Sequence, residues 1–174
     1  MTSAWSTVVG RGRDAADAWA ELECAVDPAS APPDIALLFF SPSHAARLKE
    51  TCADAARALS ARVLLGIVGA GVIGGGEEID REPAIALIAG RLPPGTEARA
   101  FAVGRDQMPA WDSILPRGEP ADADAGADVR RGNRPAFLLF ADPFSAISQA
   151  AACLNSAWPG SVVCGGLTCP PTPG

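Results

Sequence analysis

The chain has few of the residues that nucleic-acid and phosphate chemistry need. It contains one lysine, Lys49, and one histidine, His44, among 174 residues, and its formal charge is −6. A net negative charge offers no electrostatic footprint for nucleic acid or anionic lipid. Its apolar runs are shorter than the roughly 18 residues that cross a bilayer. We therefore expect a soluble protein with no nucleic-acid partner and no membrane partner.

The five cysteines are widely spaced, and no two of them form a C-x-x-C pair. With a single histidine available, they predict neither a zinc site nor a disulfide framework. Cys52 and Cys153 fall at apolar positions of helical patterns, which favours burial in a reducing compartment. The N-terminus lacks a signal-peptide core and carries early acids such as Asp14. We expect a cytoplasmic protein without cofactor or metal, and targeting to an organelle stays open.

Hydrophobic patterning predicts a strand, a helix and a second strand in the first half of the chain. Residues 34–40 (DIALLFF) form the continuous apolar run typical of a strand buried on both faces. Residues 41–43 (SPS) have helix-start chemistry, and residues 45–59 carry apolar side chains at helical spacing. Residues 63–68 (VLLGIV) are the second strand. A short strand at 5–9 and a helix after it are expected to precede this unit.

The same pattern recurs near the end of the chain. Residues 136–140 (AFLLF) precede Asp142-Pro143, which resembles a cap and first turn, and then a helical stripe and the run SVVCGG. Phe40 and Gly66 are 26 positions apart, and Phe140 and Gly165 are 25 apart. The sequence therefore predicts two βαβ-like units.

Between these units, residues 83–92 and 97–103 are β-like runs separated by a proline-glycine turn, which predicts an antiparallel meander. Residues 116–134 have almost nothing to bury and are interpreted as a low-complexity loop or linker. The second unit lacks such partner strands, so we interpret it as truncated, with a C-terminal continuation missing. The expected fold class is α/β, a mixed β-sheet flanked by helices in a single domain over residues 1–174.

Gly69, Gly71 and Gly74 match the dinucleotide-binding pattern G-x-G-x-x-G. That motif works by starting a helix whose N-terminus binds pyrophosphate, but here two more glycines, a charged segment and a β-like run follow. A Walker loop fails because Lys49 is the chain's only lysine. Two interpretations stay open: a plain hairpin between residues 68 and 84, or a ligand-binding loop at the carboxyl end of a buried strand.

The candidate ligand site combines this glycine loop with polar residues that follow the predicted strands. Ser41 follows the first strand of one unit, and Asp142 and Ser145 follow the first strand of the other, where they also suit helix capping. All could line one crevice if the two units pair. The candidate ligand-binding residues are Gly69, Gly71, Gly74, Gly75, Gly76, Ser41, Asp142 and Ser145.

Other reactive residues favour structural roles. His44 lies beside Ser41 and Ser43, but there is no G-x-S-x-G elbow, so helix capping is the better interpretation. Cys164 aligns with Leu65 in the internal repeat, which predicts a buried and inert thiol. The acidic cluster after the glycines is expected to be solvated rather than to bind a cation. Its members are Glu77, Glu78, Asp80 and Glu82.

Five segments together resemble the N-terminal FIST domain, named for F-box and intracellular signal transduction proteins. In chain order they are DIALLFFSPSH, VLLGIVGAGVIGGGEEID, PAIALIAGRLPPG, PAFLLFADPFS and GSVVCGGL. The resemblance implies a sensory module that binds small molecules, with amino acids as a candidate class, and relatives usually continue into a C-terminal FIST domain. Relatives often have G-C-[ST]-x-[EG]-G where this chain has GIVGAG at 66–71, so a thiol and a hydroxyl are missing here.

We therefore expect a non-catalytic small-molecule-binding domain in signal transduction. One alternative is a protein-interaction scaffold, such as a substrate-recognition part of a ubiquitin ligase with a signalling or ligase subunit as partner. Another is a nucleotide- or metal-dependent enzyme. A sensor should have a pocket with backbone N–H groups from residues 69–76, a scaffold an exposed apolar patch, and an enzyme two titratable groups within hydrogen-bond reach.

Overall fold

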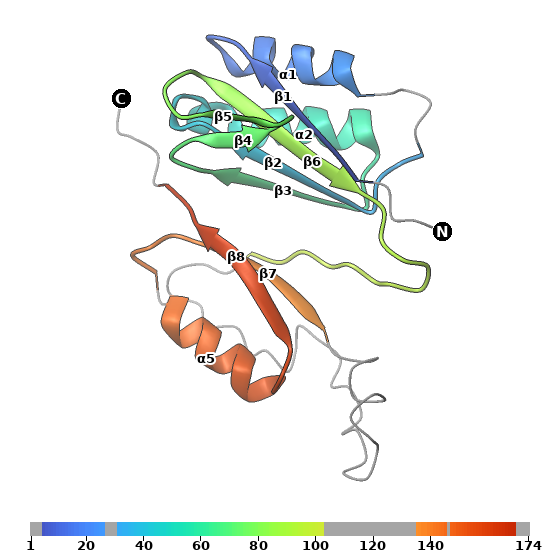
Figure 1. Ribbon diagram of the computed structural model, residues 1–174, viewed down its shortest axis with the longest axis vertical. Coiled ribbons are helices and arrows are strands. Elements are labelled where there is room, and N and C mark those ends of the chain that lie inside the picture. Colours follow the sequence, from blue (N-terminus) through green and yellow to red (C-terminus); the bar gives the residue numbers. More distant parts are fainter. Residues whose placement is uncertain (1–4, 27–30, 103–134, 146, 170–174) are drawn as a thin grey trace. The chain divides into compact units, whose positions relative to one another are not determined.

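The computed structural model describes residues 5–26, 31–102, 135–145 and 147–169. The chain divides into two compact units (Figure 1). The first unit comprises residues 1–101 together with 168–174, and the second comprises residues 102–167.

Within the described part of the first unit, four strands form a mixed sheet in the order β1-β6-β2-β3. The strands are β1 (Trp5–Arg11), β2 (Ile35–Phe40), β3 (Val63–Val68) and β6 (Ala84–Gly90). β2 and β3 are parallel, and β6 lies antiparallel between β1 and β2. The carboxyl ends of β1, β2 and β3 therefore meet at one edge of the sheet.

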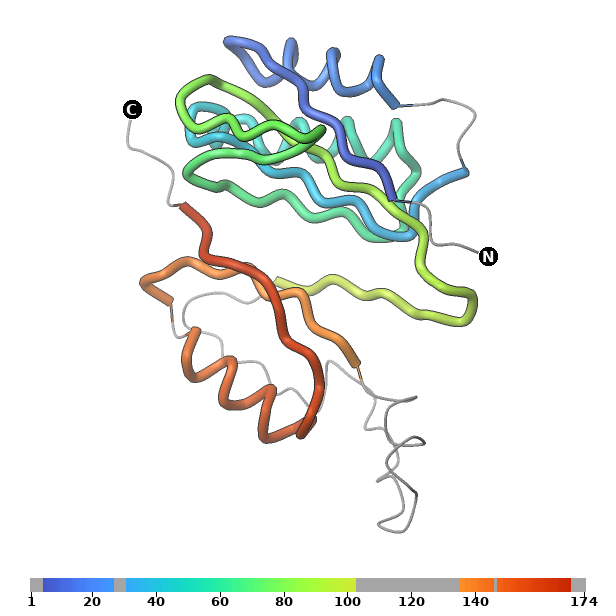
Figure 2. The backbone as a smooth tube through the Cα atoms, viewed as in Figure 1, coloured from blue at the N-terminus to red at the C-terminus, as the bar shows by residue number. Residues whose placement is uncertain are grey.

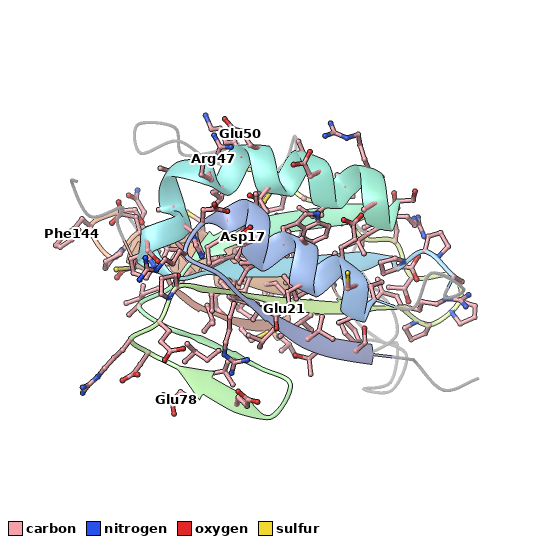
Figure 3. The ribbon with its side chains drawn as sticks, turned by 90° about the horizontal axis from the view of Figure 1, so that it is seen from above. Asp17, Glu21, Arg47, Glu50, Glu78 and Phe144 are labelled. Carbon is pink, nitrogen blue, oxygen red and sulfur yellow. The ribbon has the colours of Figure 1, made fainter. Side chains whose placement is uncertain are left out.

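Helices cover one face of this sheet. These are α1 (Ala15–Ala25) and α2 (Leu48–Leu59), the latter preceded by the 3₁₀ helix η1 (Pro42–Arg47). Figure 3 shows α1 and α2 side by side above the strands. Side chains alternate between the faces of a strand, so Ile85, Leu87 and Ala89 of β6 all point into the helix-side core.

A short hairpin covers part of the opposite face. Its strands are β4 (Val72–Gly74) and β5 (Glu77–Ile79), paired antiparallel. Val72 and Ile79 pack on Ala84 and Ala86, the β6 residues that point away from the helices and are fully buried. The chain after β3 is therefore extended rather than helical, which confirms the hairpin interpretation and removes the dinucleotide-binding one.

The second unit repeats the strand, helix and strand of the first. It contains β7 (Ala136–Ala141), α5 (Ile147–Ala157) and β8 (Val162–Leu167), and Phe137, Leu154 and Trp158 form its small core. β7 and β8 pair in parallel from Ala136 and Val162 onward, just as β2 and β3 pair from their first residues. The predicted repeat is thus confirmed, and the backbone of β7, α5 and β8 can be followed in orange and red in Figure 2.

The prediction of a second meander strand at residues 97–103 is wrong for the residues that the structure describes. Residues 97–102 are described and form no strand, while residue 103 and the predicted linker at 116–134 lie outside the described residues. Glu97 and Arg99 pair with each other on the surface, and Phe101 is 41% exposed. Apolar alternation by itself therefore did not decide the local structure, because the tendency to form a strand depends on the tertiary context.

Candidate ligand site at the strand ends

The chain leaves β2 and β3 toward opposite faces of the sheet. After Phe40 it enters η1 and α2 on the helix face, whereas after Val68 it enters the β4–β5 hairpin on the other face. The two strand ends stay adjacent, because the Gly69 N–H donates to the Phe40 carbonyl at 3.0 Å. In α/β sheets, ligands bind at the carboxyl ends of strands where neighbouring connections diverge in this way.

Ser41 lies at this divergence and is 4% exposed. Its Oγ accepts a hydrogen bond from the Ala84 N–H at 3.1 Å, and its own N–H donates to the Ala84 carbonyl at 3.0 Å. Ser41 precedes η1 as expected, but its side chain makes no capping bond, because the hydroxyl bonds β6 instead. The Ser43 hydroxyl, 3.0 Å from Ser41 Oγ, belongs to an exposed residue and so is the one a ligand can reach.

His44 is buried beneath η1, with 2% of its surface exposed. Nε2 of the His44 ring has no hydrogen-bond partner within the described chain. Burial lowers the pKa of His44, while the Gly12 carbonyl and the nearby Asp14 carboxylate partly oppose that shift. His44 is therefore a core residue, not a cap, and its ring does not bond the Ser41 hydroxyl.

The three consecutive glycines at 74–76 have structural explanations. Gly75 and Gly76 have φ angles of 58° and 84° and form the two-residue turn of the hairpin, which needs positive φ at both positions. Gly74 approaches the sheet so closely that a Cβ there would lie 2.7 Å from Val9 Cγ2. The Gly75 N–H donates to Thr7 Oγ1 at 3.3 Å, so this amide is directed at β1.

The structure thus separates the predicted glycine site into two places. Gly69 lies beside the end of β2 with Ser41, and Gly71 lies at the hairpin base, where a Cβ would come 2.8 Å from the Ile79 carbonyl oxygen. The glycines of the hairpin tip lie over Thr7, which pairs with Ile88 near the middle of β1 rather than at the carboxyl end of that strand.

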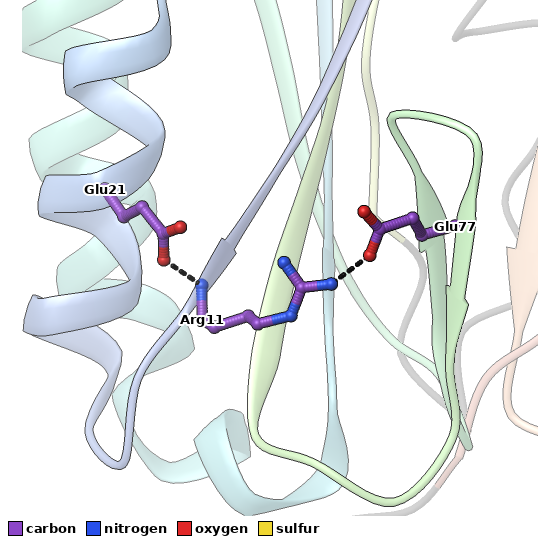
Figure 4. A network of polar contacts seen from close by, with 3 residues as sticks. All are labelled: Arg11, Glu21 and Glu77. Carbon is purple, nitrogen blue, oxygen red and sulfur yellow. Dashed lines mark hydrogen bonds and ion pairs between the residues drawn. The ribbon is translucent and has the colours of Figure 1, made fainter.

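An exposed network fastens the hairpin to the sheet (Figure 4). The Arg11 N–H donates to Glu21 Oε2 at 2.6 Å, and the Arg11 guanidinium pairs with Glu77 of β5. Sequence reasoning missed this network, because Arg11 and Glu77 are 66 positions apart and no local pattern joins them. The pair is exposed, so its contribution to stability is expected to be small.

Asp142 and Ser145 hold the turn between β7 and α5 in the second unit. The Phe144 N–H donates to Asp142 Oδ1 at 2.8 Å, and Ser145 Oγ donates to the Asp142 carbonyl at 2.6 Å. They shape the turn ahead of α5, which begins at Ile147. Their predicted share in a common crevice stays a prediction.

A surface depression between α1 and α2 was not predicted from the sequence. Its volume is about 480 Å³, and it is lined by Trp19, Glu23, Asp54, Arg57 and Ala58. Arg57 and Asp54 form an ion pair with each other there. The only hint in the sequence was that Trp19 belongs to the apolar stripe of its helix.

Two predictions about reactive side chains have opposite outcomes. Cys164 is exposed, so the prediction of a buried thiol is wrong, and the other five residues of β8 are exposed as well. The four carboxylates that follow the glycines are all exposed, as expected for a solvated cluster. In the described part of the chain, no three His, Cys, Asp or Glu side chains are grouped as a metal site would require.

The fold and the strand-end geometry define a mixed α/β domain built from a repeated strand, helix and strand. The family model of the FIST N domain matches residues 34–170, from the start of β2 to just beyond β8. The chain therefore belongs to the FIST N domain family, a family of sensory domains in signal transduction, as its sequence resemblance implied. No curated protein matches the chain. No helix among the described residues is long and apolar enough to span a membrane.

Proposed function

We propose that this chain is a cytoplasmic sensory module that binds a small polar molecule at the edge where β2 and β3 end. The observation that carries the proposal is the departure of the two connections to opposite faces of the sheet beside Ser41 and Gly69. The family's sensory role supports it.

The side chains at this edge favour binding over catalysis. Ser41 Oγ accepts a hydrogen bond from the Ala84 N–H, and His44 Nε2 bonds no described residue, so the two do not form a nucleophile and base pair. The segment from Gly66 to Gly71 carries apolar or absent side chains. Ligand contacts would thus come from backbone groups and the Ser43 hydroxyl. These groups suit a small hydrogen-bonding ligand such as an amino acid, with no metal or organic cofactor.

A thermal-shift screen of the whole chain against the amino acids, with nucleotides as a separate set, tests this proposal. A ligand at 100 times its Kd stabilises by about 2.7 kcal/mol and raises the Tm accordingly. Ser43→Ala should weaken binding of any compound that shifts the Tm, while Ser6→Ala removes a hydroxyl from exposed β1 and should leave binding unchanged. Equal binding by both variants would place the ligand elsewhere, and no shift from either set would contradict the proposal.

A protein-binding role for the second unit is the other candidate function. Large apolar side chains are exposed around β7 and β8, which is the feature expected of a scaffold. They are Leu138 (47% exposed), Phe144 (77%), Val162 (65%), Val163 (41%) and Leu167 (63%). A signalling or ubiquitin-ligase subunit would be the partner. Val162→Glu should then abolish copurification of a defined partner while leaving small-molecule binding intact.

A further inference from the structure

The depression between α1 and α2 combines side chains from one face of each helix. Trp19 and Glu23 are four positions apart on α1. Asp54, Arg57 and Ala58 follow the same helical spacing on α2. The volume of about 480 Å³ falls within the range of ligand pockets, roughly 300–1,000 Å³. None of the residues at the ends of β2 and β3 lines this depression, so it is a separate place on the first unit.

The depression is negatively charged because one of its two carboxylates has no counterion. Asp54 pairs with Arg57, whereas Glu23 forms no ion pair or side-chain hydrogen bond within the described chain. The rest of α1 adds to this charge, since Asp17 and Glu21 are exposed on it and the helix contains no lysine or arginine (Figure 3). A cation would therefore balance the charge of the lining.

The shape and lining of the depression favour a side chain of a partner protein over a free small molecule. Small-molecule sites enclose about 70–90% of the ligand surface, whereas this depression is open to solvent. Trp19 is 7% exposed and packs in the core of the first unit, so it offers a rigid aromatic surface. Arginine is the cation that suits this lining, because its planar guanidinium packs on aromatic rings and bonds carboxylates through two N–H groups.

We propose that the depression is a docking site for an arginine side chain of a partner protein. Glu23 binds the incoming guanidinium, and Trp19 packs against it. Arg57 already places a guanidinium against Asp54 here, so it competes with the partner's arginine for that carboxylate. Because this pair is exposed, exchanging one guanidinium for the other costs little. The docking site is independent of the strand-end ligand site and of the exposed apolar side chains of the second unit.

An NMR titration of the whole chain with an end-blocked pentapeptide, one arginine flanked by two glycines on each side, tests the docking site. The peptide should shift the indole N–H of Trp19, assigned with Trp19→Phe, and the amides of Glu23 and Asp54. The same peptide with citrulline in place of arginine keeps the shape of the side chain but carries no charge, so it should shift none of them. No shift at these residues with the arginine peptide, or an equal shift with the citrulline peptide, would overturn the proposal.

Two pairs of variants separate this site from a general effect of charge, and all four side chains are exposed, so the variants should fold. Glu23→Gln should weaken binding of the arginine peptide about twofold to fivefold, the range of an exposed ion pair. Glu78→Gln removes the same charge from β5 and should leave binding unchanged. Arg57→Ala should strengthen binding by a similar factor because it frees Asp54, whereas Arg81→Ala, beside β5, should not. Equal effects within either pair would contradict the docking site.

Discussion

Cys52 of α2 packs its sulfur into the space that Gly66 leaves in β3: a Cβ at Gly66 would lie 2.5 Å from Cys52 Sγ. Leu48 lines the same contact, with its Cδ2 3.2 Å from that position. The close approach of α2 to the sheet therefore depends on a residue without a side chain.

Gly66→Ala is expected to lower the free energy of unfolding by about 1–3 kcal/mol, because the added methyl group overpacks this contact. Urea denaturation measures the change. Gly166→Ala is the control, since a Cβ there meets nothing within 4 Å. Adding Cys52→Ala to Gly66→Ala should recover part of the loss. Equal effects of Gly66→Ala and Gly166→Ala would contradict the packing explanation.

Burial raises the pKa of the Cys52 thiol to about 11. At pH 8 only about one molecule in a thousand carries the reactive thiolate. N-ethylmaleimide should therefore label Cys52 far more slowly than the exposed Cys24 in the native protein, and mass spectrometry of peptides measures both rates. In guanidinium chloride the difference should disappear. Comparable labelling of the two thiols under native conditions would show that α2 does not shield Cys52.

The hairpin turn depends on positive φ at Gly75 and Gly76. Gly75→Ala should destabilise the first unit by about 1 kcal/mol, because an L side chain with a Cβ is strained in the left-handed region. Gly75→Asn should cost less, since asparagine tolerates that region. Denaturant midpoints of the two variants compare them directly. An alanine variant as stable as the asparagine variant would mean that the turn relaxes to another conformation.

Asp34 lies just before β2 and accepts hydrogen bonds from residues next to the ends of β6 and β3. Its Oδ2 accepts from the Leu92 N–H at 2.8 Å, and its Oδ1 accepts from Arg62 at 3.1 Å. These bonds, with the Leu92 N–H as the larger cause, lower the pKa of Asp34. The resulting stabilisation is present above the ordinary aspartate pKa and is lost as the pH falls through the lowered folded-state value.

Asp34→Asn should therefore be less stable than the wild type at pH 6, and the difference should shrink as the pH falls below about 4. Urea midpoints over that range measure it. Asp54→Asn removes one charge from an exposed helical pair and controls for the general effect of charge. A constant gap between Asp34→Asn and wild type at all pH values would contradict the assigned role.

Much of the secondary structure was predictable because its signals are local. The apolar run before Ser41 and its counterpart before Asp142 became strands, and each pairs in parallel with the glycine-containing run that follows it. The hairpin was also predictable, since the residues after Gly76 are too few and too β-like to form a cofactor-binding helix. Residues 97–102 show the limit, because they alternate as a strand would but form none in the structure.

The candidate site was only partly predictable. Ser41 and Gly69 do lie together, because the carboxyl ends of neighbouring parallel strands meet at one edge. The diversion of the Ser41 hydroxyl to Ala84 and the burial of His44 were missed, since both depend on contacts with distant residues. The prediction that Cys164 is buried failed for a related reason. Its position in β8 matches that of Leu65 in β3, but burial depends on what covers a strand, and the residues of β8 are exposed.

The order of residues by itself determined the segments and their repeat, because hydrophobic period, turn glycines and capping groups act over a few positions. Tertiary structure decided which face of the sheet each connection covers and which polar groups form hydrogen bonds within the protein. A hairpin folds onto β6 only because Ala84 and Ala86 leave space for Val72 and Ile79. Such complementarity is a property of surfaces brought together from distant parts of the chain, and no single stretch of sequence contains it.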